Sequence, residues 1–243
     1  MRAQTFVLRV WGDFACFSRP ELKVERFSYP LPPPSAVRGI FDAIYSKPNE
    51  FRWQAEKVEV LAEPSYIALR RNEVKDKISV RAAEQWAKGK GQPEPIWADG
   101  DADLLGTDQK GRTQRQTMAL RNVHYRLHAS IRPWSGFESQ LAALEAQFVR
   151  RASAGKCFHQ PYLGCREFAA FFELCEAESG PPPKDWNADD LGLMVYDVFD
   201  LSRPGKADDA AHISLFRPKV SRGVMTVPGY EDEAVIKLAG RAR

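Results

Sequence analysis

The segment TMALRNVHYRLHASIRP, residues 117–133, contains a strict alternation of two kinds of side chain from Val123 to Arg132. An alternation of period two is typical of a β-strand whose two faces meet different surroundings. The face expected to be buried carries Val123, Tyr125, Leu127, Ala129 and Ile131. The opposite face is predicted to be an outward ladder of basic and polar side chains, namely His124, Arg126, His128, Ser130 and Arg132.

Other periodic segments surround this strand, and their order predicts the fold class. Strands are predicted over 4–17, 56–69 and 166–174, and helices over 35–46 and 136–152. Ser35 is expected to cap the first helix. The predicted buried stripes are Val37, Ile40, Phe41 and Ile44 in that helix, and Leu141, Leu144, Phe148 and Ala152 in the second. The resulting order of strand, helix, strand, strand, helix, strand predicts an α+β chain with a ferredoxin-like (RRM-like) βαββαβ domain.

Composition along the chain predicts where this domain is interrupted and where it ends. A long polar insertion over about 70–116 is expected to hold a hairpin and loops. The stretch SGPPPKDWN at 179–187 is rich in Pro and Gly and is expected to be a linker. We therefore predict a domain over 1–178 and a C-terminal extension over 188–243. In this extension GLMVYDVFD, HISLFRPKV and GVMTVPG are expected to form a small antiparallel sheet.

The overall composition excludes several classes of protein. Hydrophobic residues make up 44% of the 243 residues, which indicates a globular chain, and the net charge of +3 does not by itself indicate nucleic acid. The four cysteines form no C-x-x-C pair, so they are expected to be reduced thiols and not zinc ligands. No signal peptide and no apolar run of membrane-spanning length are visible. We expect a cytoplasmic protein with no membrane contact, no metal and no cofactor.

Two segments carry residues suited to chemistry on a phosphate. The ladder on residues 124–132 suits RNA, because RRM-type proteins meet RNA on the central strands of their sheet. Alternatively, another part of the chain or a partner covers this face. The segment GKCFHQPYLGCREF, residues 155–168, can place Lys156, His159 and Arg166 near a phosphate. The alternative for this segment is a structured loop in which His159 bonds to the backbone.

Three stretches together carry a resemblance to a known family. They are WGDFACFSRPELKVERFSYPLPPPSAVRGIFDAIYSKP, ALRNVHYRL and CFHQPYLGCREF, in this order along residues 1–175. This combination resembles the CRISPR-associated Cas-five proteins of subtype I-C, which belong to the RAMP superfamily. The resemblance implies a ferredoxin-like domain with a C-terminal β extension. It also implies an endoribonuclease that cuts precursor CRISPR RNA in its repeat and remains bound to the 5′ handle as a subunit of the interference complex.

The resemblance also implies the chemistry and some of its residues. The ribose 2′-OH attacks the adjacent phosphate without a metal and leaves a 2′,3′-cyclic phosphate, which requires a base, an acid and a cation. The family's catalytic tyrosine falls on Tyr45, with Arg38 expected alongside on the same edge of the helix. Some members add a Lys-His pair on the second helix, but Leu144 and Glu145 occupy those positions here. We expect Lys156 and His159 to serve instead as cation and proton carrier.

RNA recognition is expected to combine phosphate contacts with stacking and base-edge contacts in a stem-loop and its flanks. The candidates are Arg9, Arg38, His124, Arg126, His128, Arg132, Arg150, Arg151 and Arg166, together with Arg70, Arg71 and Lys75 of the insertion. Two alternatives stay open. One is a subunit that binds the RNA handle without cutting it. The other is a metal-dependent nuclease acting on DNA through acidic residues such as Asp99, Asp101 and Asp103.

Overall fold

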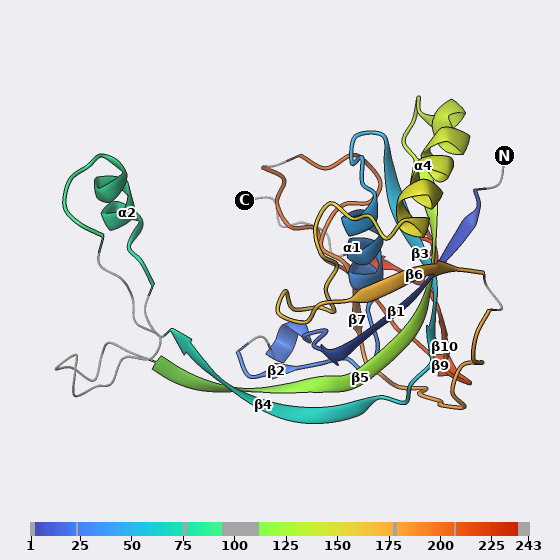
Figure 1. The fold of residues 1–243 in the computed structure, drawn as a ribbon, viewed down its shortest axis with the longest axis horizontal. Coiled ribbons are helices and arrows are strands. Elements are labelled where there is room, and N and C mark those ends of the chain that lie inside the picture. The colour runs from blue at the N-terminus through green and yellow to red at the C-terminus, as the bar shows by residue number, and fades with distance from the viewer. Residues whose placement is uncertain are drawn as a thin grey trace. The chain divides into compact units, whose positions relative to one another are not determined.

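The main β-sheet has eight strands in the computed structural model, which describes residues 3–22, 24–74, 77–93, 112–176, 179–206 and 208–237. Adjacent strands along its path are Phe171–Cys175 (β6), Thr5–Ala15 (β1), Arg112–Pro133 (β5), Phe51–Val60 (β3), Val224–Thr226 (β10) and Val220–Ser221 (β9). The short strand Arg26–Phe27 (β2) and the longer Ser65–Val74 (β4) also pair with β5. All neighbours along the path are antiparallel, so the prediction of an α+β chain with antiparallel sheets is confirmed (Figure 1).

Two helices connect the central strands. Pro34–Ile44 (α1) precedes β3, and Leu141–Ser153 (α4) lies between β5 and β6, after the 3-10 helix Glu138–Gln140 (η2). A second 3-10 helix, Pro20–Leu22 (η1), follows β1. Every residue of the two predicted apolar stripes is buried, which confirms both. The predicted cap at Ser35 is wrong: the N-cap is Pro33, and it makes no side-chain cap hydrogen bond.

Aromatic rings from both helices and from the sheet form the centre of the core. Trp53 of β3 lies 4.8 Å from Phe41 of α1 and 4.7 Å from Phe148 of α4, measured between ring centroids. Phe6 of β1 lies 4.9 Å from Phe148. Burial of each large apolar side chain contributes about 1.5–3 kcal/mol. Both helices therefore pack against the sheet face that carries Phe6 and Trp53.

The predicted strand over 56–69 is wrong, because two strands occupy this stretch. The first, β3, ends at Val60, and the backbone N–H groups of Leu61 and Ala62 both donate to the carbonyl of His124, at 2.9 and 3.3 Å. The next strand begins at Ser65, directly after Pro64, which has no N–H to donate to a ladder. The strands predicted over 4–17 and 117–133 are confirmed, and the latter begins earlier, at residue 112.

The strand predicted over 166–174 is shorter than expected and begins at Phe171. Just before it, the N–H of Phe168 donates to the Cys165 carbonyl at 3.0 Å, and that of Ala170 donates to the Pro161 carbonyl at 2.9 Å. These bonds hold the segment in turns and leave its amides without strand partners in the sheet.

The chain divides into two compact units. One comprises Met1–Ile67 with Ala119–Arg243, and the other is Ala68–Met118. The second unit contains the helix Val80–Ala87 (α2), whose N-cap Ser79 accepts a hydrogen bond from the N–H of Ala82.

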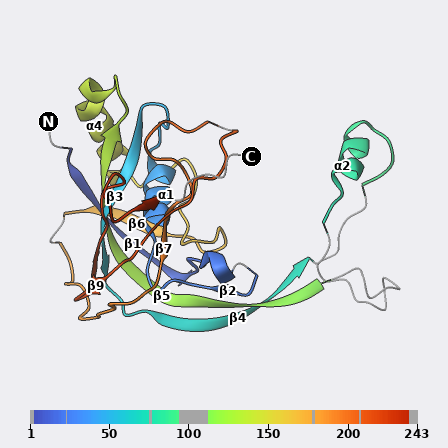
Figure 2. The ribbon, with the colours of Figure 1, turned by 180° about the vertical axis from the view of Figure 1, so that it is seen from behind.

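The C-terminal segment contributes to two sheets. Strands Met194–Asp197 (β7), Ser214–Phe216 (β8) and Ile236–Lys237 (β11) form a separate three-stranded antiparallel sheet. The expectation that GVMTVPG belongs to this small sheet is wrong. Its strand, β10, instead pairs with β3 in the main sheet, and the view from behind shows β9 beside this edge (Figure 2).

Candidate functional site

The end of helix α1 positions Tyr45. The helix stops at Ile44, and Tyr45 is extended, with φ −150° and ψ 118°. Its backbone N–H donates to the Phe41 carbonyl, and its own carbonyl accepts a hydrogen bond from Trp53 Nε1 at 2.8 Å. The ring packs against Phe51, with centroids 5.4 Å apart, and only 4% of the residue is exposed. Because Tyr45 has left the helical path, the expectation that it shares a helix edge with Arg38 is wrong.

The loop after α4 docks against this same helix end. The backbone N–H of Phe158 donates to the Ala43 carbonyl at 2.7 Å, and Arg151 Nε donates to the Ile44 carbonyl at 2.6 Å. The Arg151 guanidinium also lies 4.1 Å from the centroid of the exposed Phe158 ring. The carbonyls at the end of a helix lack partners within the helix, and here a backbone amide and an arginine satisfy two of them.

Lys156 and His159 lie in this docked loop, and both are exposed. The Lys156 N–H donates to the Arg151 carbonyl at 2.9 Å, and the His159 ring lies 6.5 Å from that of Tyr162. Phe158, which stands between them in the chain, is the residue bonded to α1. The loop therefore holds both side chains on the segment that contacts the helix carrying Tyr45. Their catalytic roles stay predictions.

Charged neighbours affect the phenol of Tyr45 in opposite directions. Burial is the largest influence and raises its pKa, Lys47 lowers it, Glu50 raises it again and Arg151 lowers it. Lys47 Nζ is itself paired with both carboxylate oxygens of Glu50, at 3.0 and 2.9 Å. The phenol is therefore protonated at neutral pH and is suited to donate a hydrogen bond. Sequence reasoning missed Lys47, although it stands two positions after Tyr45.

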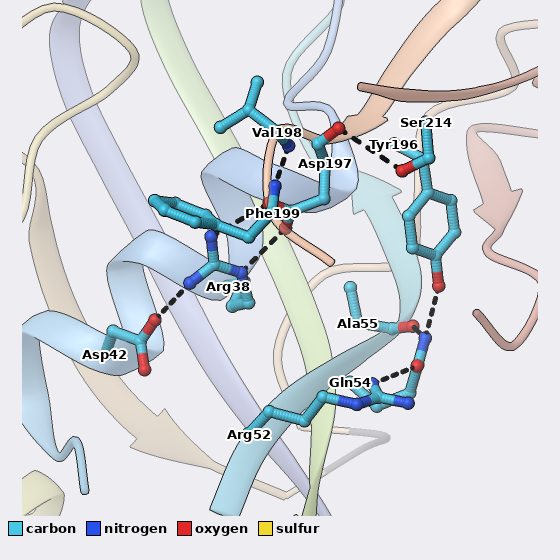
Figure 3. Close-up of polar contacts among 10 residues, drawn as sticks. All are labelled: Arg38, Asp42, Arg52, Gln54, Ala55, Tyr196, Asp197, Val198, Phe199 and Ser214. Atoms are coloured by element: carbon cyan, nitrogen blue, oxygen red, sulfur yellow. Dashed lines mark hydrogen bonds and ion pairs between the residues drawn. The ribbon is translucent and has the colours of Figure 1, made fainter. Parts of the chain in front are cut away.

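Arg38 is already engaged by carboxylates (Figure 3). Its Nε and Nη2 donate to the two carboxylate oxygens of Asp197, at 2.7 and 3.1 Å, and Nη1 donates to Asp42 at 2.7 Å. Burial alone would lower the pKa of Arg38, but Asp197 and Asp42 outweigh it and raise this pKa. Asp197 is 1% exposed and belongs to β7. Arg38 therefore joins α1 to the C-terminal sheet, which leaves little of its guanidinium for a phosphate.

The predicted basic ladder on β5 is covered in its middle. Its apolar face is buried as predicted, but Arg126 and His128 are also buried, at 4% and 3% exposure. Arg126 donates to Glu59 at 2.5 Å and to the carbonyls of Ser179 and Pro181, at 2.5 and 3.3 Å. The expectation of an open surface is therefore wrong at Arg126 and His128, where another part of the chain covers the sheet.

Two groups beside Arg126, His128 and Glu59, have lowered pKa values. His128 Nε2 lies 3.2 Å from Glu59 Oε1, and Lys57 Nζ lies 2.5 Å from the same oxygen. Burial, followed by Lys57, lowers the pKa of His128 to about 4, so the imidazole is neutral at pH 7. Burial would raise the pKa of Glu59, but Lys57 and Arg126 outweigh it and lower this pKa. Arg126 joins this cluster to the segment around residues 179–181 through the carbonyls of Ser179 and Pro181.

The remaining predicted RNA-binding residues of the larger unit are partly or fully accessible: Arg9, His124, Arg132, Arg150, Arg151 and Arg166. Arg9 is paired with Glu173 and lies beside Trp11, whose ring centroid is 6.0 Å from that of His124. Arg70 and Arg71 belong to strand β4 and to the smaller unit. Four further predicted residues lie outside the described part of the chain, namely Lys75, Asp99, Asp101 and Asp103.

Two kinds of feature are absent from the described ranges. No group of three or more His, Cys, Asp or Glu side chains there could hold a metal ion. None of the helices in those ranges is long and apolar enough to cross a membrane.

Comparison with known proteins gives a family and two similar curated sequences. The model of the family described as CRISPR-associated protein (Cas_Cas5) matches residues 5–228. The curated protein of Mannheimia succiniciproducens named "CRISPR pre-crRNA endoribonuclease Cas5d" is 36% identical over 236 residues, covering 94% of this chain and 96% of that protein. A protein of the same name from Thermus thermophilus is 37% identical over 245 residues, covering 95% of this chain and 94% of that protein.

Among solved structures, one described as "Crystal Structure of CRISPR-associated Protein" superposes with a TM-score of 0.62 and 20% sequence identity. The match covers 97% of this chain and 98% of the other. At this identity the likeness concerns the fold alone.

Proposed function

Because the chain belongs to the CRISPR-associated Cas5 family, we propose that it is an endoribonuclease that cuts precursor CRISPR RNA within the repeat. The observation that carries this proposal is the pair of relatives, both named pre-crRNA endoribonuclease, that match nearly all of the chain. After cutting, the protein stays bound to the 5′ handle as a subunit of the interference complex.

The domain that performs this function is proposed to be ferredoxin-like. The strand order β6-β1-β5-β3 supports this assignment, because it places the first, second, third and fourth core strands in the order four, one, three, two. Helices α1 and α4 lie on the two connections where the βαββαβ pattern requires them. The outer strands β9 and β10 then extend this sheet beyond β3.

The proposed reaction is attack by the ribose 2′-OH on the adjacent phosphate, without a metal ion. The 2′-oxygen bonds to phosphorus, the 5′-oxygen leaves and takes a proton, and the products are a 2′,3′-cyclic phosphate and a 5′-OH. Burial raises the pKa of Tyr45, so its phenol keeps its proton at neutral pH. The hydroxyl can therefore donate a hydrogen bond or a proton. The imidazole of His159, exposed in the loop that docks on α1, is proposed to carry the other proton.

A cation is also required, because the phosphate gains negative charge in the transition state. Lys156 is proposed for this role from its place in the loop that docks on α1. Arg151 supports the arrangement, since it lies in the last turn of α4 and bonds to the residue before Tyr45. The accessible arginines Arg9, Arg132, Arg150 and Arg166, together with His124, are proposed to bind the RNA, with affinity that falls as salt rises.

The test is cleavage of a labelled repeat RNA in excess chelator. We expect one cut at the base of the repeat hairpin, with a cyclic phosphate on the upstream product. Tight binding without a cut would contradict the enzymatic part of the proposal. Cutting that appears only after addition of a metal ion would contradict the proposed mechanism.

One observation favours a second candidate, a subunit that binds the handle without cutting. The positions at which some relatives carry Lys-His hold Leu144, which is 3% exposed, and Glu145, which accepts a hydrogen bond from the N–H of Gln4 at 2.8 Å. Neither side chain can supply the missing imidazole. The cleavage assay in chelator separates the two candidates directly.

A further inference from the structure

A cavity of about 250 Å³ lies beside the end of α1. Ser46, the residue after Tyr45, lines it, as do Arg52 of β3, Trp134 after β5 and Phe199 after β7. Its charged lining residues are the cations Arg38, Arg52, Arg203 and Lys206 and the acids Asp42 and Asp200. Cations therefore outnumber carboxylates in the wall, which favours an anionic ligand.

Most of the guanidinium groups in this wall are already paired. Arg38 is held by Asp42 and Asp197, and Arg203 lies 2.9 Å from Asp209 and 3.4 Å from Asp200. Neutralised groups of this kind shape the cavity but have little capacity left for a further anion.

Arg52 is different, because it has no carboxylate partner within the described ranges. Its one hydrogen bond there runs from Nη1 to Gln54 Oε1, at 2.8 Å. It is half-buried, and burial lowers its pKa. Directly across the sheet it faces a second cation, Arg132. Arg132 lies 3.4 Å from Glu56, so of the two facing arginines Arg52 is the one without a carboxylate partner among the described residues. Figure 3 shows Arg52 directed away from the Arg38 cluster, toward Gln54.

Aromatic rings also line the cavity. The Arg52 guanidinium lies 6.0 Å from the centroid of Trp134, and Trp134 Nε1 donates to the Pro48 carbonyl at 2.7 Å, which fixes its orientation. Phe199 lies 5.2 Å from the Arg38 guanidinium, and 54% of it is exposed. Proteins bind unpaired bases by stacking them on such rings and bind phosphates through arginine.

We propose that this cavity binds one unpaired nucleotide of the RNA, with its base against an aromatic ring of the wall and its phosphate on Arg52. An aromatic wall with one uncompensated guanidinium matches a planar base that carries a single anionic group. Since Ser46 lines the cavity, the bound nucleotide would lie beside the helix end that carries Tyr45. This inference rests on the proposed function, because it takes RNA as the source of the nucleotide.

The test compares variants by fluorescence anisotropy with labelled single-stranded repeat RNA. Arg52→Gln should weaken binding about tenfold and reduce the salt slope of the affinity by about one. Phe199→Ala, which removes an exposed ring, should weaken binding about fivefold or more. The matched control is Arg217→Gln, which removes a charge from an exposed arginine that does not line the cavity. The control should bind like the unmodified protein.

The outcomes distinguish this inference from the proposed function. If Arg52→Gln and Phe199→Ala bind RNA as the control does while the unmodified protein cuts it, the nucleotide site is overturned and the proposed function stands. If the unmodified protein neither binds nor cuts RNA, the proposed function fails. In that case the binding of uridine and adenosine 5′-monophosphates is measured in place of RNA binding. If these mononucleotides bind and Arg52→Gln abolishes the binding, the cavity is a site for a free nucleotide, and RNA as the source of the nucleotide is overturned. If Arg52→Gln strongly lowers the melting temperature, the RNA affinity of Phe199→Ala alone decides whether the cavity binds the nucleotide.

Discussion

Arg151 Nε donates a hydrogen bond of 2.6 Å to the carbonyl of Ile44, the residue directly before Tyr45. The last turn of α4 thereby supplies a hydrogen-bond donor to a carbonyl at the end of α1. The same guanidinium contacts the ring of Phe158, whose backbone N–H donates to Ala43. One arginine therefore links both helices and the loop that carries Lys156 and His159.

Replacement of Arg151 should consequently affect stability and cutting together. Arg151→Ala removes the hydrogen bond to Ile44 and the contact with Phe158, and we expect a loss of about 1–3 kcal/mol in the free energy of unfolding. Urea unfolding measures this directly. Arg150→Ala is the control, because Arg150 is exposed and bonds only to Gln147 on its own helix among the described contacts. Equal stability of the two variants would contradict the link.

Replacement of Tyr45 by Phe removes only a hydroxyl from a buried ring. If the phenol donates a hydrogen bond or a proton during cutting, the single-turnover rate should fall about a hundredfold or more. RNA affinity should stay within about twofold, because the packing against Phe51 remains. Tyr66→Phe is the control, since it deletes a phenol that bonds to the Ser28 carbonyl. An unchanged cutting rate in Tyr45→Phe would remove Tyr45 from the mechanism.

Glu59 should contribute strongly to the stability of the sheet around the buried Arg126. Glu59→Gln leaves Arg126 buried without a charge partner, and we expect a loss of about 3–5 kcal/mol in the free energy of unfolding. Glu173→Gln breaks the partly exposed pair with Arg9 and should cost about 0–1 kcal/mol. Chemical denaturation of both variants checks the contrast. Similar losses would show that Glu59 contributes no more than a surface ion pair.

Acid should destabilise the protein through His128. The pKa of His128 is lowered to about 4 in the folded state, whereas an unfolded histidine titrates near pH 6.5. Between these values the unfolded state binds more protons, so the free energy of unfolding falls as the pH drops, by up to about 3 kcal/mol from this group. Glu59 acts in the same direction at lower pH, because its pKa is lowered too.

The variant His128→Gln isolates this contribution. Its free energy of unfolding should depend less on pH between 6.5 and 4 than that of the unmodified protein, as measured by urea unfolding at several pH values. Parallel pH profiles for the two proteins would show that His128 is not the group responsible.

Local sequence patterns predicted the buried faces well. The alternation on β5 and the stripes of α1 and α4 identified residues that are buried in the structure, such as Leu127, Phe41 and Phe148. These predictions worked because the side-chain period of a strand or helix is a property of the local backbone. The prediction over 56–69 failed where a short turn joins two strands and the apolar pattern continues across it.

The candidate site was predicted in part. The resemblance led to Tyr45, and composition led to the loop of Lys156 and His159, which the structure docks on the same helix end. Lys47 and the cavity around Arg52 were missed. Arg52 lacks a carboxylate partner among the described residues only because of how the surrounding segments pack, and no pattern near it in the sequence reveals this.

The order of apolar and polar residues along the chain sets which faces of the strands and helices are apolar, and therefore which sides turn inward. What covers the other side of β5 follows from long-range packing. Arg126 pairs with Glu59, 67 positions away, and Arg38 pairs with Asp197, 159 positions away. A charged side chain in an outward pattern looks the same in the sequence whether solvent or a distant carboxylate faces it. Its partner is set by long-range packing, and this separates the carboxylate-paired cations Arg38 and Arg126 from those left exposed to solvent.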